Sequence, residues 1–321
     1  MKVLFAGSPG IAVPALEALS REEGITLAVL TNPDSPKGRK AGQGKAEPTE
    51  IGAAAEIISA RLAAGGKQPV PVFKPLKLDA GAREEISAFG PDLLVSFAYG
   101  KIFGPKFLAL FPLGGINIHP SLLPKYRGAA PIPAAILNRE AETGISIQKL
   151  APEMDSGDIL AVERLQLTGR ETTGSLGEIM AQKAAQMLPA VLKDIAAGKA
   201  RAAPQNHSEA SYCSLLVKEE GLIDWNKSAA EIDARIRAFD PWPLCWTIHE
   251  GRQLFILKAS AMDTGPGTPG LVLGIDKGRG ILVQTGEGAL AVTELQYQAR
   301  KALEWRAFLN GSRNFTGSRL G

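Results

Sequence analysis

The chain has 321 residues, a formal charge of +3, and 45% hydrophobic and 21% charged residues, which is typical of globular proteins. Its length predicts two domains, and so small a charge gives no argument for a nucleic-acid partner. No window approaches the roughly 18 uninterrupted apolar residues that a membrane span needs. Gly7-Ser8-Pro9-Gly10 interrupt the first apolar run, so we expect neither a secretory signal nor a membrane contact.

The cysteines and histidines exclude two further classes of site. Cys213 and Cys245 are too far apart for a CxxC site and too few for a disulfide framework, so we expect reduced thiols in a cytoplasmic protein. His207 falls in a linker-like segment and His249 at a turn. We therefore expect both histidines at the surface and no metal site.

Strand and helix patterns alternate over residues 1–200. Apolar runs predict strands at 2–7, 25–30, 70–73, 92–98, 115–119, 144–150 and 159–167. Helical spacing of apolar residues occurs between them, at 13–21, 53–62, 80–89, 134–138 and 175–197. This alternation predicts an α/β fold, a Rossmann-like and mostly parallel sheet with helices on both faces.

Residues 31–48 are rich in Gly, Pro, Lys and Asp, a composition that predicts a long mobile loop. Lys37, Arg39 and Lys40 make the loop locally basic. Basic runs are usually solvated surfaces, so charge alone leaves a phosphate-binding role open.

The pattern changes after residues 199–209, KARAAPQNHSE, whose small and polar residues predict a linker between domains at 1–198 and 210–321. An amphipathic helix is predicted at 228–238 and a short helix at 301–310. Between them, turn signals separate five short strands, at 246–249, 254–259, 270–275, 280–285 and 289–297. This pattern predicts a small OB-like β-barrel, a fold that commonly binds nucleic acid.

The residues after the first strand do not support a dinucleotide site. The GxGxxG fingerprint is missing, and Thr31-Asn32 occupy the place of the acidic residue that would follow the second strand. The general rule for open α/β sheets still applies, that ligands bind beyond the carboxyl ends of the strands. Tyr99-Gly100, His119 and residues 152–157 all follow predicted strands, so we expect them to converge on one pocket.

Asn117 and His119 alternate across the apolar run INIH, so on a strand their side chains point to the same face. An amide and an imidazole at the mouth of a strand can hold and protonate a developing oxyanion, and the Asp155 carboxylate can orient the imidazole. We interpret these residues as an acyl-type transfer site. Taken alone, the motif leaves a second interpretation open, in which Asn117 ends a strand and His119 is hydrogen-bonded without any catalytic role.

With these segments the chain resembles the methionyl-tRNA formyltransferase family over essentially its whole length. The resemblance rests on FAGSP, TNPDSPKGRK, AYGKI, INIHPSLLPKYRGAAPI, AETGISI and MDSGDIL, and in the second domain on LIDWNKSAAEIDARIRAFDPWPLCW. NIHPSLLPKY is shared with purine-pathway glycinamide ribonucleotide formyltransferases. RGAAPI and the second-domain segment separate the two families.

The resemblance implies an enzyme of translation initiation. It would transfer the formyl group of 10-formyltetrahydrofolate to the α-amine of methionyl initiator tRNA by direct attack through a tetrahedral intermediate, without a metal. Asn117, His119 and Asp155 are the implied catalytic residues. Asp155 is expected to raise the pKa of His119, whose protonated ring would stabilise the oxyanion together with the Asn117 amide.

The resemblance also implies the binding residues. The folate slot is formed by the SLLP turn and by residues of AYGKI, namely Ser121, Leu122, Leu123, Pro124, Tyr99, Gly100, Lys101 and Ile102. The loop with Lys37, Arg39 and Lys40 would reach toward the acceptor end of the tRNA. The second domain and the basic tail, residues 300–321, would hold the backbone of the tRNA. We expect a monomer.

Two alternatives stay open. One is another formyltetrahydrofolate-dependent enzyme, either the hydrolase domain of formyltetrahydrofolate dehydrogenase or a sugar-nucleotide N-formyltransferase. RGAAPI and the KGRK loop favour the tRNA enzyme over both. The other is a non-catalytic RNA-binding module, against which the intact set of Asn117, His119 and Asp155 argues.

Overall fold

The structure is a computed structural model that describes residues 1–36, 46–312 and 314–321. Lys37, Arg39 and Lys40 lie outside these residues. The chain divides into two compact units. The first unit consists of Met1–Gly128, Thr143–Leu165 and Gly177–Tyr212, and the second of Ala129–Glu142, Gln166–Leu176 and Cys213–Gly321.

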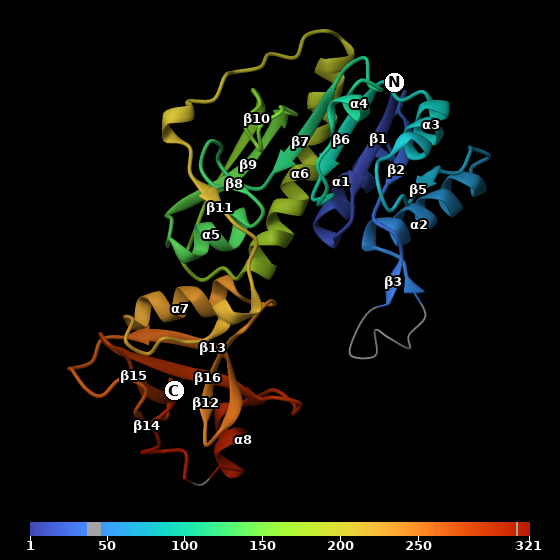
Figure 1. Cartoon of the computed structure of the whole chain (residues 1–321). Helices are drawn as coiled ribbons and strands as arrows, with labels where there is room; N and C mark the ends of the chain where they lie inside the picture. Colours follow the sequence, from blue (N-terminus) through green and yellow to red (C-terminus); the bar gives the residue numbers. More distant parts are fainter. Residues whose placement is uncertain (37–45, 313) are drawn as a thin grey trace. The chain divides into compact units, whose positions relative to one another are not determined.

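The first unit is built on a seven-stranded sheet in the order β10-β9-β7-β6-β1-β2-β5 (Figure 1). These strands are β1 (Lys2–Gly7), β2 (Thr26–Leu30), β5 (Val72–Phe73), β6 (Leu93–Phe97), β7 (Gly115–His119), β9 (Glu142–Lys149) and β10 (Ile159–Gln166). The ladders from β5 to β7 are parallel, and β9 joins β7 in antiparallel register. The predicted Rossmann-like, mostly parallel sheet is confirmed.

Helices and short elements lie between these strands or follow the last of them. They are η1 (Gly10–Ala12), α1 (Val13–Leu19), β3 (Ser35–Pro36), β4 (Ala46–Glu47), α2 (Glu50–Ala64), α3 (Ala80–Phe89), α4 (Pro105–Leu108), α6 (Thr173–Ala196), η2 (His207–Glu209) and the paired strands β8 (Arg127–Gly128) and β11 (Tyr212–Cys213). All five residues of β6 are buried, which shows that both faces of the central sheet are covered. Thr49 begins α2, its Oγ1 accepting a hydrogen bond from Gly52 N at 3.0 Å.

The second unit contains an antiparallel sheet in the order β12-β13-β16-β15-β14, with β17 beside β16 (Figure 1). These strands are β12 (Cys245–His249), β13 (Arg252–Met262), β14 (Val272–Asp276), β15 (Gly280–Gln284), β16 (Ala289–Tyr297) and β17 (Leu303–Glu304). The helical elements of this unit are α5 (Pro131–Leu137), η3 (Lys218–Gly221), α7 (Ala229–Ala238) and α8 (Trp305–Asn310). Ser228 and Glu231 form a capping box that begins α7.

The last residues of the chain connect the two ends of this sheet. Leu320 N donates to Gly270 O at 2.8 Å, immediately before β14, and Gly321 N donates to Ile248 O in β12 at 3.0 Å. These bonds bridge the two end strands of the antiparallel sheet, as a small barrel requires.

The structure differs from two local predictions. His249 is buried, with 4% of its surface exposed, because its ring packs against Phe315 and its Nδ1 lies 2.6 Å from the Tyr297 hydroxyl. The prediction of a surface histidine was therefore wrong. The predicted final helix is shortened to Trp305–Asn310, because Leu303 pairs with Leu295 as strand β17.

The segment predicted as a linker belongs to the first unit. Ala203 exchanges backbone hydrogen bonds with Ile159 at 2.8 and 2.9 Å, and Gln205 is buried. Residues 129–142 and 166–176 belong to the second unit instead. A boundary at 198 stays a prediction.

Two further observations concern the helices and the cysteines. No helix in the described part of the chain is both long and apolar enough to cross a membrane. Cys213 and Cys245 form no disulfide, and burial raises the pKa of the Cys245 thiol to about 12.

Gly144 in β9 provides a test of the packing beneath the SLLP turn. A Cβ at this position would overlap the Glu163 carbonyl oxygen and the Leu122 side chain. We expect Gly144→Ala to lower the free energy of unfolding by about 1–3 kcal/mol in urea titrations. Gly104→Ala is the matched control, since a Cβ there meets nothing within 4 Å. Equal stability of the two variants would contradict this packing.

Candidate active site

The site lies at the carboxyl edge of the first unit's sheet. β6 and β7 are parallel neighbours, and Ser96 lies opposite Asn117 in their register. The chain segments that follow these two strands therefore emerge at the same edge. They are residues 98–102 after β6 and 120–124 after β7, the two segments predicted to bind folate.

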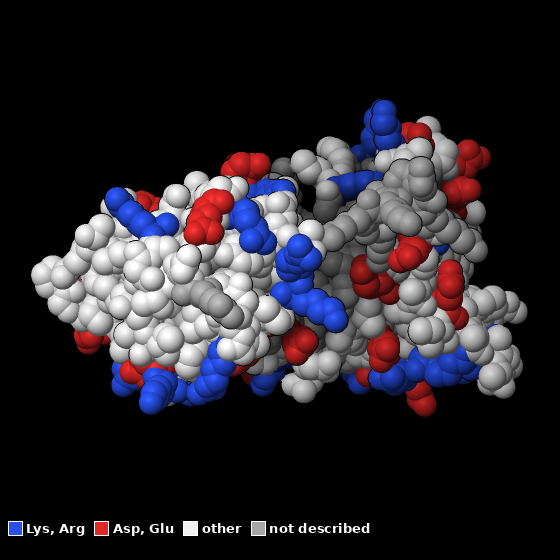
Figure 2. Space-filling view, turned by 90° about the horizontal axis from the view of Figure 1, so that it is seen from below, with Lys and Arg blue, Asp and Glu red and all other residues white. Residues whose placement is uncertain are grey.

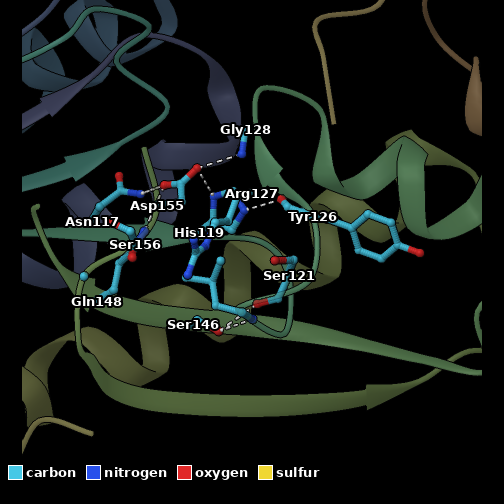
Figure 3. Close-up of polar contacts among 12 residues, drawn as sticks. Asn117, His119, Ser121, Tyr126, Arg127, Gly128, Ser146, Gln148, Asp155 and Ser156 are labelled. Atoms are coloured by element: carbon cyan, nitrogen blue, oxygen red, sulfur yellow. Dashed lines mark hydrogen bonds and ion pairs between the residues drawn. The ribbon is translucent and has the colours of Figure 1, made fainter. Parts of the chain in front are cut away.

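Asn117, His119 and Asp155 converge at this edge (Figure 3). Asn117 Nδ2 lies 3.3 Å from Asp155 Oδ1, and His119 Nδ1 lies 3.5 Å from Asp155 Oδ2. The side chains of His119 and Asp155 are 5% and 12% exposed. The structure thus brings together an amide, an imidazole and a carboxylate that come from β7 and from a turn 36 residues beyond it along the chain (119 to 155).

The hydrogen bonds of His119 fix its neutral tautomer. Nε2 lies 2.8 Å from the Tyr126 carbonyl oxygen, which can only accept, so Nε2 carries the hydrogen. In the neutral ring Nδ1 then has the lone pair. Its separation from Asp155 Oδ2, 3.5 Å, is longer than a good hydrogen bond.

The pKa of His119 is lowered, not raised. Burial disfavours the charged ring, and this effect outweighs the opposing contributions of Asp155 and the Tyr126 carbonyl. The expectation that the pKa of His119 is raised was therefore wrong, although Asp155 acts in the expected direction. A neutral imidazole beside a carboxylate can instead accept a proton, because Asp155 stabilises the imidazolium that forms.

Three parts of the chain donate to the Asp155 carboxylate. Gln148 Nε2 donates to Oδ1 at 2.9 Å, beside the Asn117 amide, and Gly128 N donates to Oδ2 at 2.8 Å. Asn117 and Gln148 lie opposite each other in the β7–β9 ladder, so one carboxylate oxygen receives both of their amides. Asp155 itself has a left-handed backbone, with φ of +51°.

Side-chain to backbone hydrogen bonds hold the SLLP turn in place. Ser146 Oγ donates to Ser121 O at 2.8 Å and accepts from Leu123 N at 3.1 Å. Ser121 Oγ donates to Lys125 O at 2.6 Å. The Leu123–Pro124 peptide bond is cis. These bonds fix the conformation of the turn, which follows His119 directly in the chain.

The segment after β6 combines anchored and exposed groups. The Tyr99 ring is buried and stacks on Phe103 at 5.4 Å, and burial raises the pKa of its hydroxyl to about 12. Lys101 Nζ donates to the carbonyls of Pro75 and Leu76, each at 3.0 Å. Gly100 has φ of +80°, and a Cβ at this position would meet no atom within 4 Å. The side chain of Ile102 is exposed, with 86% of the residue's surface accessible.

Two of these groups, Gly100 and Ile102, could contact a flat heterocyclic ligand. An open glycine allows close approach to the backbone, and exposed Ile102 offers apolar surface. Tyr99 and Lys101 instead contact other parts of the protein and keep the segment after β6 in position. No group of three or more His, Cys, Asp or Glu that could bind a metal occurs among residues 1–36, 46–312 and 314–321.

Three polar residues around the site were not predicted from the sequence. Gln148 follows Ile147 near the end of β9, and a polar residue at the end of a strand was a usable signal. Arg127 and Gln205 are 2% and 6% exposed and bond to each other. Nothing in the local sequence marks Gln205 as buried, because its neighbours are small and polar.

The described residues on the face shown in Figure 2 do not single out a nucleic-acid site by their charge. On the face shown in Figure 2, described Lys and Arg side chains are interspersed with Asp and Glu. Arg306 of the basic tail is paired with Glu304 at 3.3 Å. The charge pattern of the described residues is therefore mixed on this face.

Known families and proteins match the whole chain. The model of the formyl transferase family matches residues 1–192, and that of the formyl transferase C-terminal domain matches residues 215–313. A methionyl-tRNA formyltransferase from Treponema denticola is 48% identical over 98% of both chains. Another from Methylacidiphilum infernorum is 39% identical over 100% of this chain and 98% of its own.

Solved structures share the fold at low sequence identity. An N-formyltransferase from Helicobacter canadensis, in complex with folinic acid and dTDP-3-aminofucose, has a TM-score of 0.65 at 18% identity and covers 91% of this chain and 99% of its own. HypX from Aquifex aeolicus, in complex with tetrahydrofolic acid, has a TM-score of 0.62 at 15% identity. The match covers 98% of this chain, which spans about half of HypX (48%).

Burial of His119 predicts a pH dependence of stability. Its folded-state pKa lies below the ordinary value of 6.5, so the unfolded state binds more protons once the pH falls to that value. Protonation of His119 in the unfolded state therefore lowers the free energy of unfolding as the pH falls from about 6.5 to the folded-state pKa. Above about pH 6.5 this effect is absent.

The measurement is urea unfolding at about pH 7.5 and about pH 5.5. We expect the wild type to lose more stability on acidification than His119→Gln, which cannot titrate here. Subtracting the loss of stability of His119→Gln from that of the wild type removes the contributions of the other titrating groups. An equal loss in both would show that burial does not lower this pKa.

Proposed function

The chain belongs to the formyl transferase family, and on this premise we propose that it transfers the formyl group of 10-formyltetrahydrofolate to the α-amine of methionyl initiator tRNA. The observation that carries the proposal is the 48% identity to a methionyl-tRNA formyltransferase over 98% of the chain. In this chain the side chains of Asn117, His119 and Asp155 converge. The chain is 48% identical to a methionyl-tRNA formyltransferase but only 18% identical to an N-formyltransferase complexed with dTDP-3-aminofucose, which favours this activity over sugar-nucleotide formyl transfer.

The reaction needs a donor at the formyl oxygen. As the amine nitrogen bonds to the formyl carbon, negative charge collects on that oxygen. Asn117 Nδ2 carries two hydrogens, of which one is directed at Asp155 Oδ1. The other hydrogen is the oxyanion donor in this proposal, and Asp155 fixes the direction of the amide.

The reaction also moves a proton from the attacking nitrogen to N10 of the leaving group. His119 is neutral and its Nδ1 has the lone pair, so Nδ1 is the proposed proton acceptor. Asp155 stabilises the imidazolium that then forms, and the ring returns the proton to N10 as the bond from the formyl carbon to N10 breaks. His119 thus acts first as base and then as acid.

We place the folate between the SLLP turn and the segment after β6. Ser121, Leu122, Leu123 and Pro124 supply one side, and Tyr99, Gly100, Lys101 and Ile102 the other. The support is their common position at the carboxyl edge of β6 and β7. Bound folate supplies the activated formyl group, and these residues orient it.

We assign tRNA binding to the loop with Lys37, Arg39 and Lys40 and to the second unit. The assignment rests on the charge of the loop and on the resemblance, since these three residues lie outside the described part of the chain. We further propose that the protein acts as a monomer in the cytoplasm.

Substitution at the reacting centre tests the activity. We expect Asn117→Ala to lower kcat about a hundredfold to a thousandfold, because it removes an oxyanion donor. His119→Ala should lower kcat by about 10²–10⁴ through loss of the base. The assay is formyl transfer to charged initiator methionyl-tRNA. Asn206→Ala, at an exposed amide of the first unit, is the control and should retain wild-type kcat.

Uncharged tRNA and free methionine serve as acceptor controls in the same assay. Transfer to the charged tRNA alone, lost in the His119 variant, is the expected result. Release of formate and tetrahydrofolate without transfer would instead assign the chain to the hydrolases.

Arg39→Ala tests the loop. Loss of one phosphate contact should raise KM for the tRNA, leave kcat largely unchanged, and reduce the slope of log affinity against log salt by about 1. The matched control is Arg21→Ala, an exposed arginine that is paired with Glu17. An unchanged salt slope for Arg39→Ala would remove this residue from the tRNA site.

A further inference from the structure

Gln205 connects the turn that carries Asp155 to a buried arginine. Its Nε2 lies 2.9 Å from Asp155 O, 2.7 Å from Gly157 O and 3.2 Å from Gln148 Oε1. Its Oε1 accepts from Arg127 Nε at 3.2 Å and from Arg127 Nη2 at 2.6 Å. Every polar atom of this amide is therefore used inside the protein.

Arg127 determines how the amide is oriented. A guanidinium only donates, so the oxygen of Gln205 must face Arg127 and the nitrogen must face the carbonyls of the turn. Arg127 is fixed in turn by His207 Nδ1 at 3.0 Å, by the Tyr212 hydroxyl at 3.3 Å and by its own N–H to Ser211 O at 2.8 Å. The amide of Gln205 thus has one satisfied orientation.

The turn needs such support because its backbone is unusual. Asp155 has φ of +51°, a left-handed conformation that non-glycine residues adopt uncommonly. A residue in this region keeps its conformation only when its surroundings hold it there. Gln205 bonds to the carbonyls of Asp155 and Gly157, while the Asp155 side chain faces Asn117 and His119.

We propose that Gln205 is a positioning residue for the transfer reaction. It holds the Asp155 turn so that one carboxylate oxygen faces the Asn117 amide and the other faces His119 Nδ1. The inference rests on the proposed function, because it assigns Gln205 to the same reaction. Gln205 acts on the substrate only through Asp155.

The main test is Gln205→Met, which keeps the length of the side chain and removes its hydrogen bonds. Displacement of Asp155 should lower kcat about tenfold to a hundredfold. KM for 10-formyltetrahydrofolate and for methionyl-tRNA should stay within about twofold, because Gln205 contacts neither in the proposal. Asn206→Ala is the matched control. This adjacent, exposed amide caps only η2 and should retain wild-type kcat.

A double-mutant cycle separates positioning from general damage. If Gln205 acts through Asp155, adding Gln205→Met to Asp155→Ala should change kcat by less than about twofold. If Gln205 only stabilises the fold, the two losses should multiply. Urea unfolding of each variant gives its folded fraction, to which kcat is normalised.

Gln205→Glu covers the case in which the methionine variant does not fold. Its carboxylate still pairs with Arg127 but presents oxygen to the carbonyls of Asp155 and Gly157, so kcat should fall here too. Wild-type kcat in either Gln205 variant, or multiplied losses in the double variant, would overturn the inference. Failure of the wild type to transfer formyl would instead overturn the proposed function, so the two failures are distinguishable.

Discussion

The carboxylate of Asp155 is the interaction on which the rest of the site depends. It receives the amides of Asn117 and Gln148 on one oxygen and the N–H of Gly128 on the other. With 12% of its side chain exposed, Asp155 has little access to water, so these donors replace the hydration that the carboxylate loses where it faces His119. The β7–β9 register, Gly128 in β8 and the 155–157 turn are consequently linked through one side chain.

The chemistry follows from a competition between burial and charge at His119. Burial favours the neutral ring, and Asp155 favours the imidazolium. A ring held between these two effects can take up a proton and return it within one turnover, as a transfer between two nitrogens requires. The Tyr126 carbonyl contributes by deciding which nitrogen carries the resting hydrogen.

Sequence patterns predicted the strands of the central sheet and the meeting of Asn117, His119 and Asp155, because continuous apolar runs and strand-end polar residues are local signals. They did not predict the pKa of His119, which depends on burial by the whole fold. They gave no sign of Gln205 either. A buried amide is recognisable only from its partners, and its partners at 127, 148, 155 and 157 are distant in sequence.

The division of the chain into two units has a consequence for modularity. The chain passes from one unit to the other five times, at 128/129, 142/143, 165/166, 176/177 and 212/213. A cut at residues 199–209 would therefore separate α5 from α7, which it contacts within the second unit. A fragment that ends there would leave this side of α5 without its partner and expose apolar surface to solvent.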